Sequence, residues 1–260
     1  MFEKEKLLAK NARCTALTMV HSAQSAHIGS SLSIIDIAVQ LYSKSTTIDG
    51  SGDLVLISKG HAAAGVYAVL SCLQVIPNEW VLNYCKNGSE LGGHVTSTNV
   101  PILELSTGSL GHALPYALGR ALGKSRLQQT GHVYVVISDG ECNEGSNWEA
   151  ALLAPQLNLK NLTVIIDRNH LQSLGKTEET IALEPLSEKW RAFNWEVYEI
   201  DGHDFAQLSR ITNETNQTKP RIFIANTVKG KGVSFMENSV LWHYRPPNSE
   251  ELGLALKELN

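Results

Sequence analysis

Apolar residues recur at helical spacing in the first part of the chain. Three segments show the pattern: one around Leu7 to Val20, one from Leu32 to Tyr42, and one from Ala62 to Leu73. Side chains three and four positions apart share one face of a helix, so each segment predicts a helix with a buried face. Ser33, which follows the Ser/Gly cluster at 29–31, is a suitable N-cap for the second helix.

Short β-branched runs without polar alternation indicate strands that are buried on both faces. The clearest are Tyr134–Ile137 and Thr163–Ile166, and Leu54–Ile57 has the same character. Parallel strands that are covered by helices on both sides have this pattern. A helical segment from about Trp148 to Leu157 lies between the two clearest strands, which predicts a right-handed βαβ unit.

The alternation of strand and helix continues further along the chain. Glu196–Ile200 is a strand candidate with a helix from Phe205, and Arg221–Ala225 is another strand candidate. The polar stretch Thr212–Lys219 is interpreted as a helix end and a loop. This alternation predicts an α/β fold, with a doubly wound, mostly parallel sheet flanked by helices. A chain of 260 residues without repeats or a Pro/Ser-rich linker is expected to form one domain, residues 1–260.

Composition is typical of a soluble globular protein. Hydrophobic residues make up 43% and charged residues 18%, and no apolar run reaches the roughly 18 residues that a membrane span requires. The N-terminus begins with mixed charges and lacks a secretory signal pattern, so we expect a cytoplasmic protein. With a net charge of −4, the chain has no basic field that would attract nucleic acid.

Four cysteines without metal or disulfide spacing are expected to be reduced and mostly buried: Cys14, Cys72, Cys85 and Cys142.

Polar residues follow the two clearest strands at the point where each strand ends. Ser138, Asp139 and Gly140 come directly after the first, and Asn169 follows the second, about thirty residues after Asp139. Ligands of open parallel sheets bind beyond the carboxyl ends of the strands, so these side chains are expected to meet there. A carboxylate and an amide oxygen suit Mg²⁺ or Ca²⁺, and a glycine lets the backbone approach a bound diphosphate. Taken singly, each residue is better explained as a turn or a cap, and it is the pair at equivalent strand ends that favours a metal site.

The same residues, with Glu144-Gly145, resemble a thiamine diphosphate motif, in which an acid and a distal asparagine hold the metal that clamps the cofactor. Further segments resemble transketolase blocks in order and spacing: 25–29 (SAHIG), 58–63 (SKGHAA), 91–94 (LGGH) and 106–111 (STGSLG). Residues 228–235 (VKGKGVSF), with Trp242 and His243, resemble the closing block of the N-terminal subunit of split transketolases. The resemblance covers nearly the whole chain and is specific as a set.

The resemblance implies roles for individual residues. Asp139, Asn169 and the carbonyl of Leu171 would coordinate Mg²⁺ or Ca²⁺. Glu144 would lie at an interface between subunits that links two cofactor sites. Four histidines would face the thiazolium and the sugar hydroxyls: His27, His61, His94 and His243. The cofactor would lie along His61, Gly108, Ser109, Leu110, Asp139, Gly140, Glu141, Asn169, Leu171 and His243.

Histidine suits such a site because its pKa lies near neutrality, so it can exchange protons with sugar hydroxyls while the thiamine ring accepts electrons. Four other histidines are interpreted as structural: His21, His132, His170 and His203. His112 is equally compatible with a structural role and with a place at the site.

Lys229 and Lys231 are compatible with surface positions or with contacts to a phosphate. The tryptophans at 148, 190 and 195 fit packing.

Two departures from the family pattern bear on the assembly. Ala26 and Ile28 replace the usual glycine and proline around His27, which resembles the split subunits more than full-length transketolases. Near the metal motif, Ser138 replaces the usual glycine, and Asn143 lies where related split subunits often carry an acid. The family's pyrimidine-binding domain, which carries the glutamate that activates the cofactor, has no counterpart in this sequence. We therefore expect that a separate C-terminal subunit completes the enzyme as a heterotetramer, and that the substrate is a sugar or a sugar phosphate.

The resulting hypothesis is the N-terminal subunit of a two-component transketolase, a transferase of EC 2.2.1 class that moves a two-carbon ketol unit from a ketose to an aldose. The alpha subunit of a 2-oxoacid dehydrogenase is an alternative, but His27, His61 and His94 favour a polyhydroxylated substrate. A non-catalytic scaffold is a second alternative, although packing does not require Asp139 and Asn169. A nicotinamide-dependent dehydrogenase would need a GxGxxG fingerprint after an early strand, and none is present.

Overall fold

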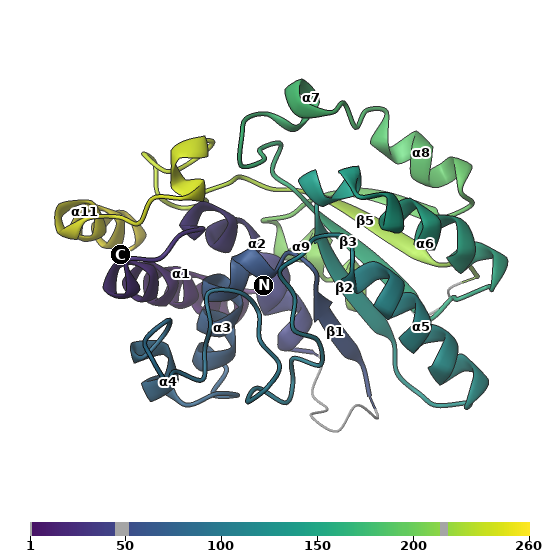
Figure 1. Ribbon diagram of the computed structural model, residues 1–260, viewed down its shortest axis with the longest axis horizontal. Coiled ribbons are helices and arrows are strands. Elements are labelled where there is room, and N and C mark those ends of the chain that lie inside the picture. The colour runs from purple at the N-terminus through teal and green to yellow at the C-terminus, as the bar shows by residue number, and fades with distance from the viewer. Residues whose placement is uncertain (1, 45–51, 214–217) are drawn as a thin grey trace.

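Five parallel strands form the sheet of the computed structural model, which describes residues 2–44, 52–213 and 218–260 (Figure 1). The strands lie in the order β1-β2-β3-β5-β4, and each neighbouring pair is parallel. Their bounds are β1 Leu54–Ile57, β2 Val133–Ser138, β3 Leu162–Arg168, β4 Glu196–Asp201 and β5 Arg221–Asn226. The predicted α/β class with a parallel sheet is confirmed.

Helices cover both faces of this sheet (Figure 1). On one face lie α1 (Glu3–Ala23), α2 (Ile28–Tyr42) and α3 (Ala63–Cys72), which also pack against one another. On the other face lie α5 (Ala113–Arg126), α6 (Gly145–Gln156) and α8 (Leu186–Ala192). The other helical segments are η1 (Gly60–Ala62), α4 (Asn78–Leu82), η2 (Gly140–Asn143), α7 (Thr177–Thr180), α9 (Phe205–Leu208), α10 (Arg210–Asn213), η3 (Val240–His243) and α11 (Ser249–Leu259).

Alternate residues of the central strands belong to different layers of the core. In β2, Val133, Val135 and Ile137 pack with α5 and α6, whereas Tyr134 and Val136 pack with the layer of α1 to α3. All five are buried. Because helices cover both faces, neither set of side chains needs to be polar, which explains the uninterrupted apolar runs in the sequence.

The predicted strands agree closely with the observed ones. Leu54–Ile57 has the predicted bounds, and β2 and β3 extend the predicted runs by one or two residues at each end. The predicted helix between them is α6, which begins at Gly145, ahead of the expected Trp148. The helix predicted from Ala62 is α3, preceded by the short turn η1. Of the stretch Thr212–Lys219, residues 214–217 lie outside the described residues, and α10 ends at Asn213.

The predicted start of the second helix was wrong. Helix α2 begins at Ile28, and its N-cap is His27, which has a left-handed backbone with φ of 74°. Ser33 lies inside the helix, where its hydroxyl donates hydrogen bonds to the Ser30 carbonyl (3.0 Å) and to Asp167 Oδ2 (2.7 Å). The Ser33 side chain therefore contacts β3 and does not cap the helix. Because the helix begins earlier than predicted, His27 lies at the end of the sheet.

Helices α2 and α3 approach closely at Gly65, and this contact yields a prediction. A Cβ at Gly65 would lie 2.4 Å from the Ser31 carbonyl oxygen, so Gly65→Ala should separate the helices and lower the free energy of unfolding by roughly 1–3 kcal/mol. A Cβ at Gly119 in α5 would meet nothing within 4 Å, so Gly119→Ala should be neutral or stabilising by up to about 1 kcal/mol. Urea unfolding of both variants measures the contrast. Equal stability of the two variants would contradict the close helix contact.

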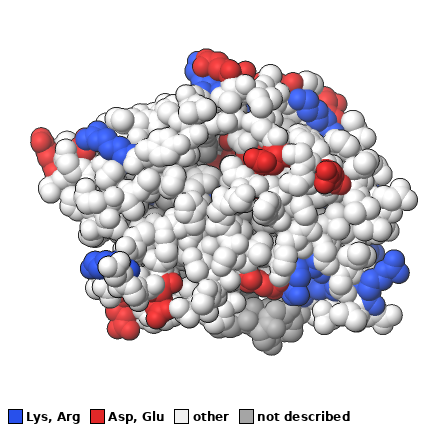
Figure 2. All heavy atoms as spheres, in the orientation of Figure 1, with Lys and Arg blue, Asp and Glu red and all other residues white. Residues whose placement is uncertain are grey.

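Charged side chains are dispersed over the face shown in Figure 2. Lys and Arg lie near its edges and form no continuous basic patch there. Among the described residues, no helix has the length and apolar character needed to cross a bilayer.

Candidate functional site

Most of the predicted site residues line one cavity of about 210 Å³, which lies beyond the carboxyl ends of β2 and β3. The predicted residues in its wall are His27, His61, His94, Gly108, Leu110, Asp139, Gly140, Asn169, Leu171 and His243. Ser30, Ser138, Gln172 and Ser173 complete the lining. These four were not predicted, although each lies within a few residues of a predicted one, and that proximity was the only available signal.

The four predicted histidines come from separate segments and meet at His27. The His27 ring centroid lies 5.5 Å from that of His61, 5.6 Å from that of His94 and 5.0 Å from that of His243. His27 lies at the left-handed turn at the start of α2, and the His27 backbone N–H donates to the His243 carbonyl at 2.8 Å. This hydrogen bond joins segments more than two hundred residues apart in the chain.

Burial keeps three members of this histidine cluster, His27, His61 and His243, neutral. Burial, aided by His94 and Lys229, lowers the pKa of His27 to about 4. Burial and the Lys229 charge lower the pKa of His243 to about 3, and burial with Lys59 holds the pKa of His61 well below its usual range. A neutral imidazole has one nitrogen that donates and one that accepts, so these rings can hydrogen-bond to hydroxyl groups of a ligand in either direction.

Asp139 and Asn169 meet at the adjacent ends of β2 and β3. The Asp139 carboxylate is 1% exposed and accepts hydrogen bonds from the backbone N–H of Gly140 (2.7 Å) and His170 (2.6 Å). Arg168 Nη1 lies 3.4 Å from it. Burial, with the nearby Asp167 charge, raises the pKa of Asp139 to about 6. A bound cation would offset this burial cost and favour the ionised form of the carboxylate.

The donor set fits a hard divalent cation in combination with a ligand. No group of three or more His, Cys, Asp and Glu side chains within the described ranges could hold a metal alone. The cavity instead offers the Asp139 carboxylate, the Asn169 amide oxygen and the backbone of Leu171. Mg²⁺ is commonly held by one or two carboxylates plus the phosphate oxygens of a ligand, so an incomplete protein set is what such a site requires.

Three predicted residues do not line the cavity. Ser109 is exposed, and Glu144 is exposed at the start of α6. Glu141 is fully buried, and its carboxylate accepts hydrogen bonds from the Ser58 hydroxyl and from the backbone N–H of Gly111 (2.8 Å) and Ser138 (3.2 Å). Glu141 thus binds together the loops that follow β1 and β2 and the start of α5. Its direct contact with a cofactor stays a prediction.

A buried ion pair beneath the cavity was not predicted. The side chains of Lys59 and Asp167 have no exposed surface and form a salt bridge. Asp167 also accepts hydrogen bonds from the hydroxyls of Ser33 and Thr227. The pair joins the ends of β1, β3 and β5 to α2. Its partners are 108 residues apart in sequence, so no local pattern could have revealed it.

Lys229 and Lys231 differ although only one residue separates them. Lys229 is 1% exposed, and its Nζ lies 2.8 Å from Nδ1 of His243. Lys231 is partly exposed, and its Nζ lies 3.7 Å from Glu237 Oε1. Neither residue lines the cavity. Lys229 is therefore connected to the histidine cluster through His243, and Lys231 has the surface position that the sequence also allowed.

The side chains of the remaining histidines are not among those that line the cavity. His112 is exposed at the start of α5, and His170 is exposed. Three others hydrogen-bond to protein groups: His21 to the Pro247 carbonyl, His132 to Thr163 and His203 to Asp36. Trp148, Trp190 and Trp195 pack against one another in the α6–α8 layer, as the packing interpretation required.

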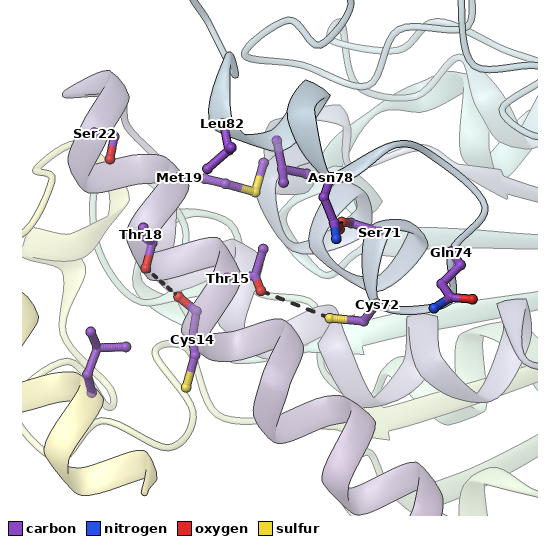
Figure 3. A pocket seen from close by; sticks show the side chains of 12 residues that line it. Cys14, Thr15, Thr18, Met19, Ser22, Ser71, Cys72, Gln74, Asn78 and Leu82 are labelled. Carbon is purple, nitrogen blue, oxygen red and sulfur yellow. Dashed lines mark hydrogen bonds between the residues drawn. The ribbon is translucent and has the colours of Figure 1, made fainter.

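A larger groove of about 670 Å³ lies between α1, α3 and α4 (Figure 3). Its lining contains no Asp, Glu, His, Lys or Arg, so it offers no acid, base or anion-binding side chain. Two cysteines line it, Cys14 and Cys72, and burial raises the pKa of both thiols. All four cysteines are unpaired, as predicted, but only Cys142 is buried. The smaller, histidine-lined cavity is therefore the candidate functional site.

Comparisons with known sequences agree with this arrangement. The family model described as "Transketolase, thiamine diphosphate binding domain" matches residues 4–259. The chain is 38% identical to one of the subunits of the apulose-4-phosphate transketolase of Actinobacillus succinogenes, over 99% of this chain and 96% of the relative. It is 35% identical to the SqwG subunit of the 6-deoxy-6-sulfo-D-fructose transketolase of Clostridium sp., over 90% of this chain and 88% of the relative.

Solved structures give the same result. The transketolase of Campylobacter jejuni superposes with a TM-score of 0.90 at 27% identity, and covers 98% of this chain. The chain spans 42% of the length of that enzyme. The family match, the relatives named as transketolase subunits and the cavity beyond β2 and β3 lead to one assignment. The chain belongs to the transketolase family, and it corresponds over its whole length to the subunit that carries the thiamine diphosphate binding domain.

Proposed function

We propose that the chain binds thiamine diphosphate and a divalent cation in the histidine-lined cavity and, with a partner subunit, transfers a two-carbon ketol unit from a ketose to an aldose. One observation carries the proposal: neutral histidines and the Asp139–Asn169 pair line the same cavity. The first set suits a polyhydroxylated substrate, and the second suits a metal-bound diphosphate.

The chain's own residues divide between holding the cofactor and handling the substrate. Asp139, Asn169 and the Leu171 carbonyl would hold Mg²⁺ or Ca²⁺, and the cofactor's diphosphate would complete the coordination. Gly108 and Gly140 line the cavity without side chains, which leaves room for the cofactor along its wall. When bound, thiamine diphosphate supplies the electron sink for cleavage of the carbon–carbon bond.

His27, His61 and His94 would manage the substrate's hydroxyl protons. His27 and His61 are neutral near pH 7 because their pKa values are lowered by burial, so each ring has a free accepting nitrogen available for a hydroxyl proton. His94 lies next to His27, with 5.6 Å between the ring centroids. A cluster of three rings can contact several hydroxyls at once, which favours a sugar over the single carbonyl of a 2-oxoacid.

A partner subunit would supply the pyrimidine-binding part of the site. The relatives of the same length are named as transketolase subunits, whereas the C. jejuni enzyme is more than twice as long. Exposed apolar side chains flank the cavity lining: Leu174, 84% exposed, follows Ser173, and Leu241 and Tyr244 lie beside His243. Burying these residues would favour association. We propose that residues 1–260 form one domain and that two such chains, meeting near Glu144, join two partners in a cytoplasmic heterotetramer.

The substrate is proposed to be a ketose that carries an anionic group. Two relatives are named for apulose 4-phosphate and 6-deoxy-6-sulfo-D-fructose, and both names include such a group. Lys59 and Lys229 lie near the cavity, but both are buried, Lys59 against Asp167 and Lys229 against His243. The anionic group would therefore be bound mainly by residues of the partner.

The test compares the chain alone, the partner alone and their mixture. The mixture should bind thiamine diphosphate in a calorimeter only when Mg²⁺ or Ca²⁺ is present, and it should transfer ketol units between sugars in a coupled assay. The chain alone should show no ketol transfer. Robust transfer by the isolated chain would refute the two-component proposal, and a mixture without metal-dependent cofactor binding would refute the cofactor assignment.

A further inference from the structure

Lys229 reaches the histidine cluster along a narrow buried path. A Cβ at Gly29 would lie 3.1 Å from Lys229 Cγ and 3.2 Å from the Trp242 carbonyl oxygen, so a larger residue at 29 would press on the lysine stem. The path ends at Nδ1 of His243, 2.8 Å from Lys229 Nζ. The glycine, the buried stem and the short hydrogen bond together fix the lysine against one particular atom of the histidine ring.

Backbone contacts hold both partners of this hydrogen bond in place. The Gly230 N–H donates to the Gly29 carbonyl (2.9 Å), and the Asn238 N–H donates to the Lys229 carbonyl (2.9 Å). Val228 N–H donates to Nε2 of His203 at 2.9 Å. His243 is attached to the start of α2 through the hydrogen bond between its carbonyl and the His27 N–H. The segments that carry the lysine and the imidazole are therefore both attached to the start of α2.

The location of the proton follows from the chemistry of the two groups. An ammonium group has only donors, whereas a neutral imidazole has one donor and one acceptor. Burial lowers the pKa of Lys229 to about 8, so the amine remains protonated at neutral pH, and the pKa of His243 is about 3, so the ring is uncharged. Within the hydrogen bond, Nζ must donate and Nδ1 must accept.

We infer that Lys229 is a positioning residue that locks His243 in the tautomer with its proton on Nε2, so that His243 presents a hydrogen-bond donor to the cavity. This assigns His243 a different task from its neighbours in the cluster. His27 and His61 can accept a hydroxyl proton, whereas His243 donates to an oxygen of a bound ligand. The tautomer does not depend on the proposed function; the consequence for the ligand rests on it.

Nitrogen NMR of the full chain labelled with ¹⁵N-histidine tests the tautomer directly. At neutral pH the His243 ring, assigned by the loss of its signals in His243→Gln, should show a pyridine-type shift for Nδ1 and a pyrrole-type shift for Nε2. A pyrrole-type Nδ1, or shifts averaged between the two tautomers, would overturn the inference. Once the His243 signals are assigned, the wild-type spectrum decides this point without cofactor or partner, so its result is separate from the test of the proposed function.

Two lysine variants then test the cause. Lys229→Met retains the buried stem but removes the donor, so the His243 shifts should move to values averaged between the tautomers. Lys231→Met is the matched control, since Lys231 is only two residues away and pairs with Glu237 at the surface; its spectrum should match the wild type. Lys229→Arg, which restores a donor, should recover part of the wild-type shifts. A Lys229→Met spectrum identical to that of the wild type would show that another group sets the tautomer.

Discussion

Asp139→Ala should abolish metal-dependent binding of thiamine diphosphate by the chain and its partner. Loss of a residue that only supports a metal ligand typically weakens metal affinity by about 10–100-fold, so loss of the single carboxylate at this site should weaken it by at least about 100-fold. The amide of Asn169 and a backbone carbonyl remain, but neither carries the charge that attracts the cation. Calorimetric titration of the cofactor in the presence of Mg²⁺ measures the effect.

Two further variants separate loss of the ligand from loss of the fold. Asp139→Asn keeps the shape of the side chain but only one acceptor oxygen, so it can retain only one of the hydrogen bonds from Gly140 and His170. It should bind no cofactor and should still unfold cooperatively, with an unfolding temperature somewhat below that of the wild type. Asp201→Ala changes an exposed aspartate at the end of β4, outside the cavity, and should bind as the wild type does. Wild-type cofactor affinity in Asp139→Asn would exclude this carboxylate as the metal ligand.

Lys59→Met should destabilise the chain strongly. The variant leaves the Asp167 carboxylate without its cation in a position that has no exposed surface. Removing one partner of a buried ion pair typically costs about 3–5 kcal/mol, because the remaining charge stays buried and unpaired. The hydroxyls of Ser33 and Thr227 offset only part of this cost. Equilibrium unfolding in urea gives the free energy directly.

The control for this variant is a lysine in an exposed ion pair. Lys176 lies 2.9 Å from Glu179, and both side chains are about two-thirds exposed, 68% and 67%. Lys176→Met should leave the unfolding midpoint unchanged, since solvent screens such pairs. Adding Asp167→Asn to Lys59→Met should recover part of the lost stability, because it removes the unpaired charge. A loss in Lys59→Met no larger than in Lys176→Met would show that the buried pair contributes nothing to stability.

The sequence was most informative where secondary structure and chemistry coincide. The β2 and β3 runs are unmistakable because both faces are buried, and Asp139 and Asn169 stand directly at their ends. Parallel pairing then determines that these residues meet, since Ser138 lies beside Asp167 in the register. The histidines were found by resemblance alone, because His27, His61, His94 and His243 share no local pattern.

What the sequence did not reveal depends on contacts between distant segments. A helix start at His112 was expected, but the extent of helix α5 was not predicted. The helix contains Gly119 and Gly123 and begins with Ala-Leu-Pro, which weakens its intrinsic helical tendency, and burial against β2 and α6 compensates. Ser33 was interpreted as a cap because its true partner, Asp167, is 134 residues away. Lys59 and Lys229 are ordinary lysines in the sequence, and only the fold places them beneath the histidines.

The hydrogen bonds of the buried Glu141 carboxylate couple the effects of substitutions in the loops around the site. One buried carboxylate binds Ser58, Gly111 and Ser138, so loops after two different strands and the start of a helix share a single anchor. Substitutions in these loops would not have independent effects, because a shift in one alters the hydrogen bonds available to the others. Double-mutant cycles across the loops would therefore give sizeable coupling energies. New substrate specificity would require coordinated replacements, and single-loop libraries would sample mostly inactive combinations.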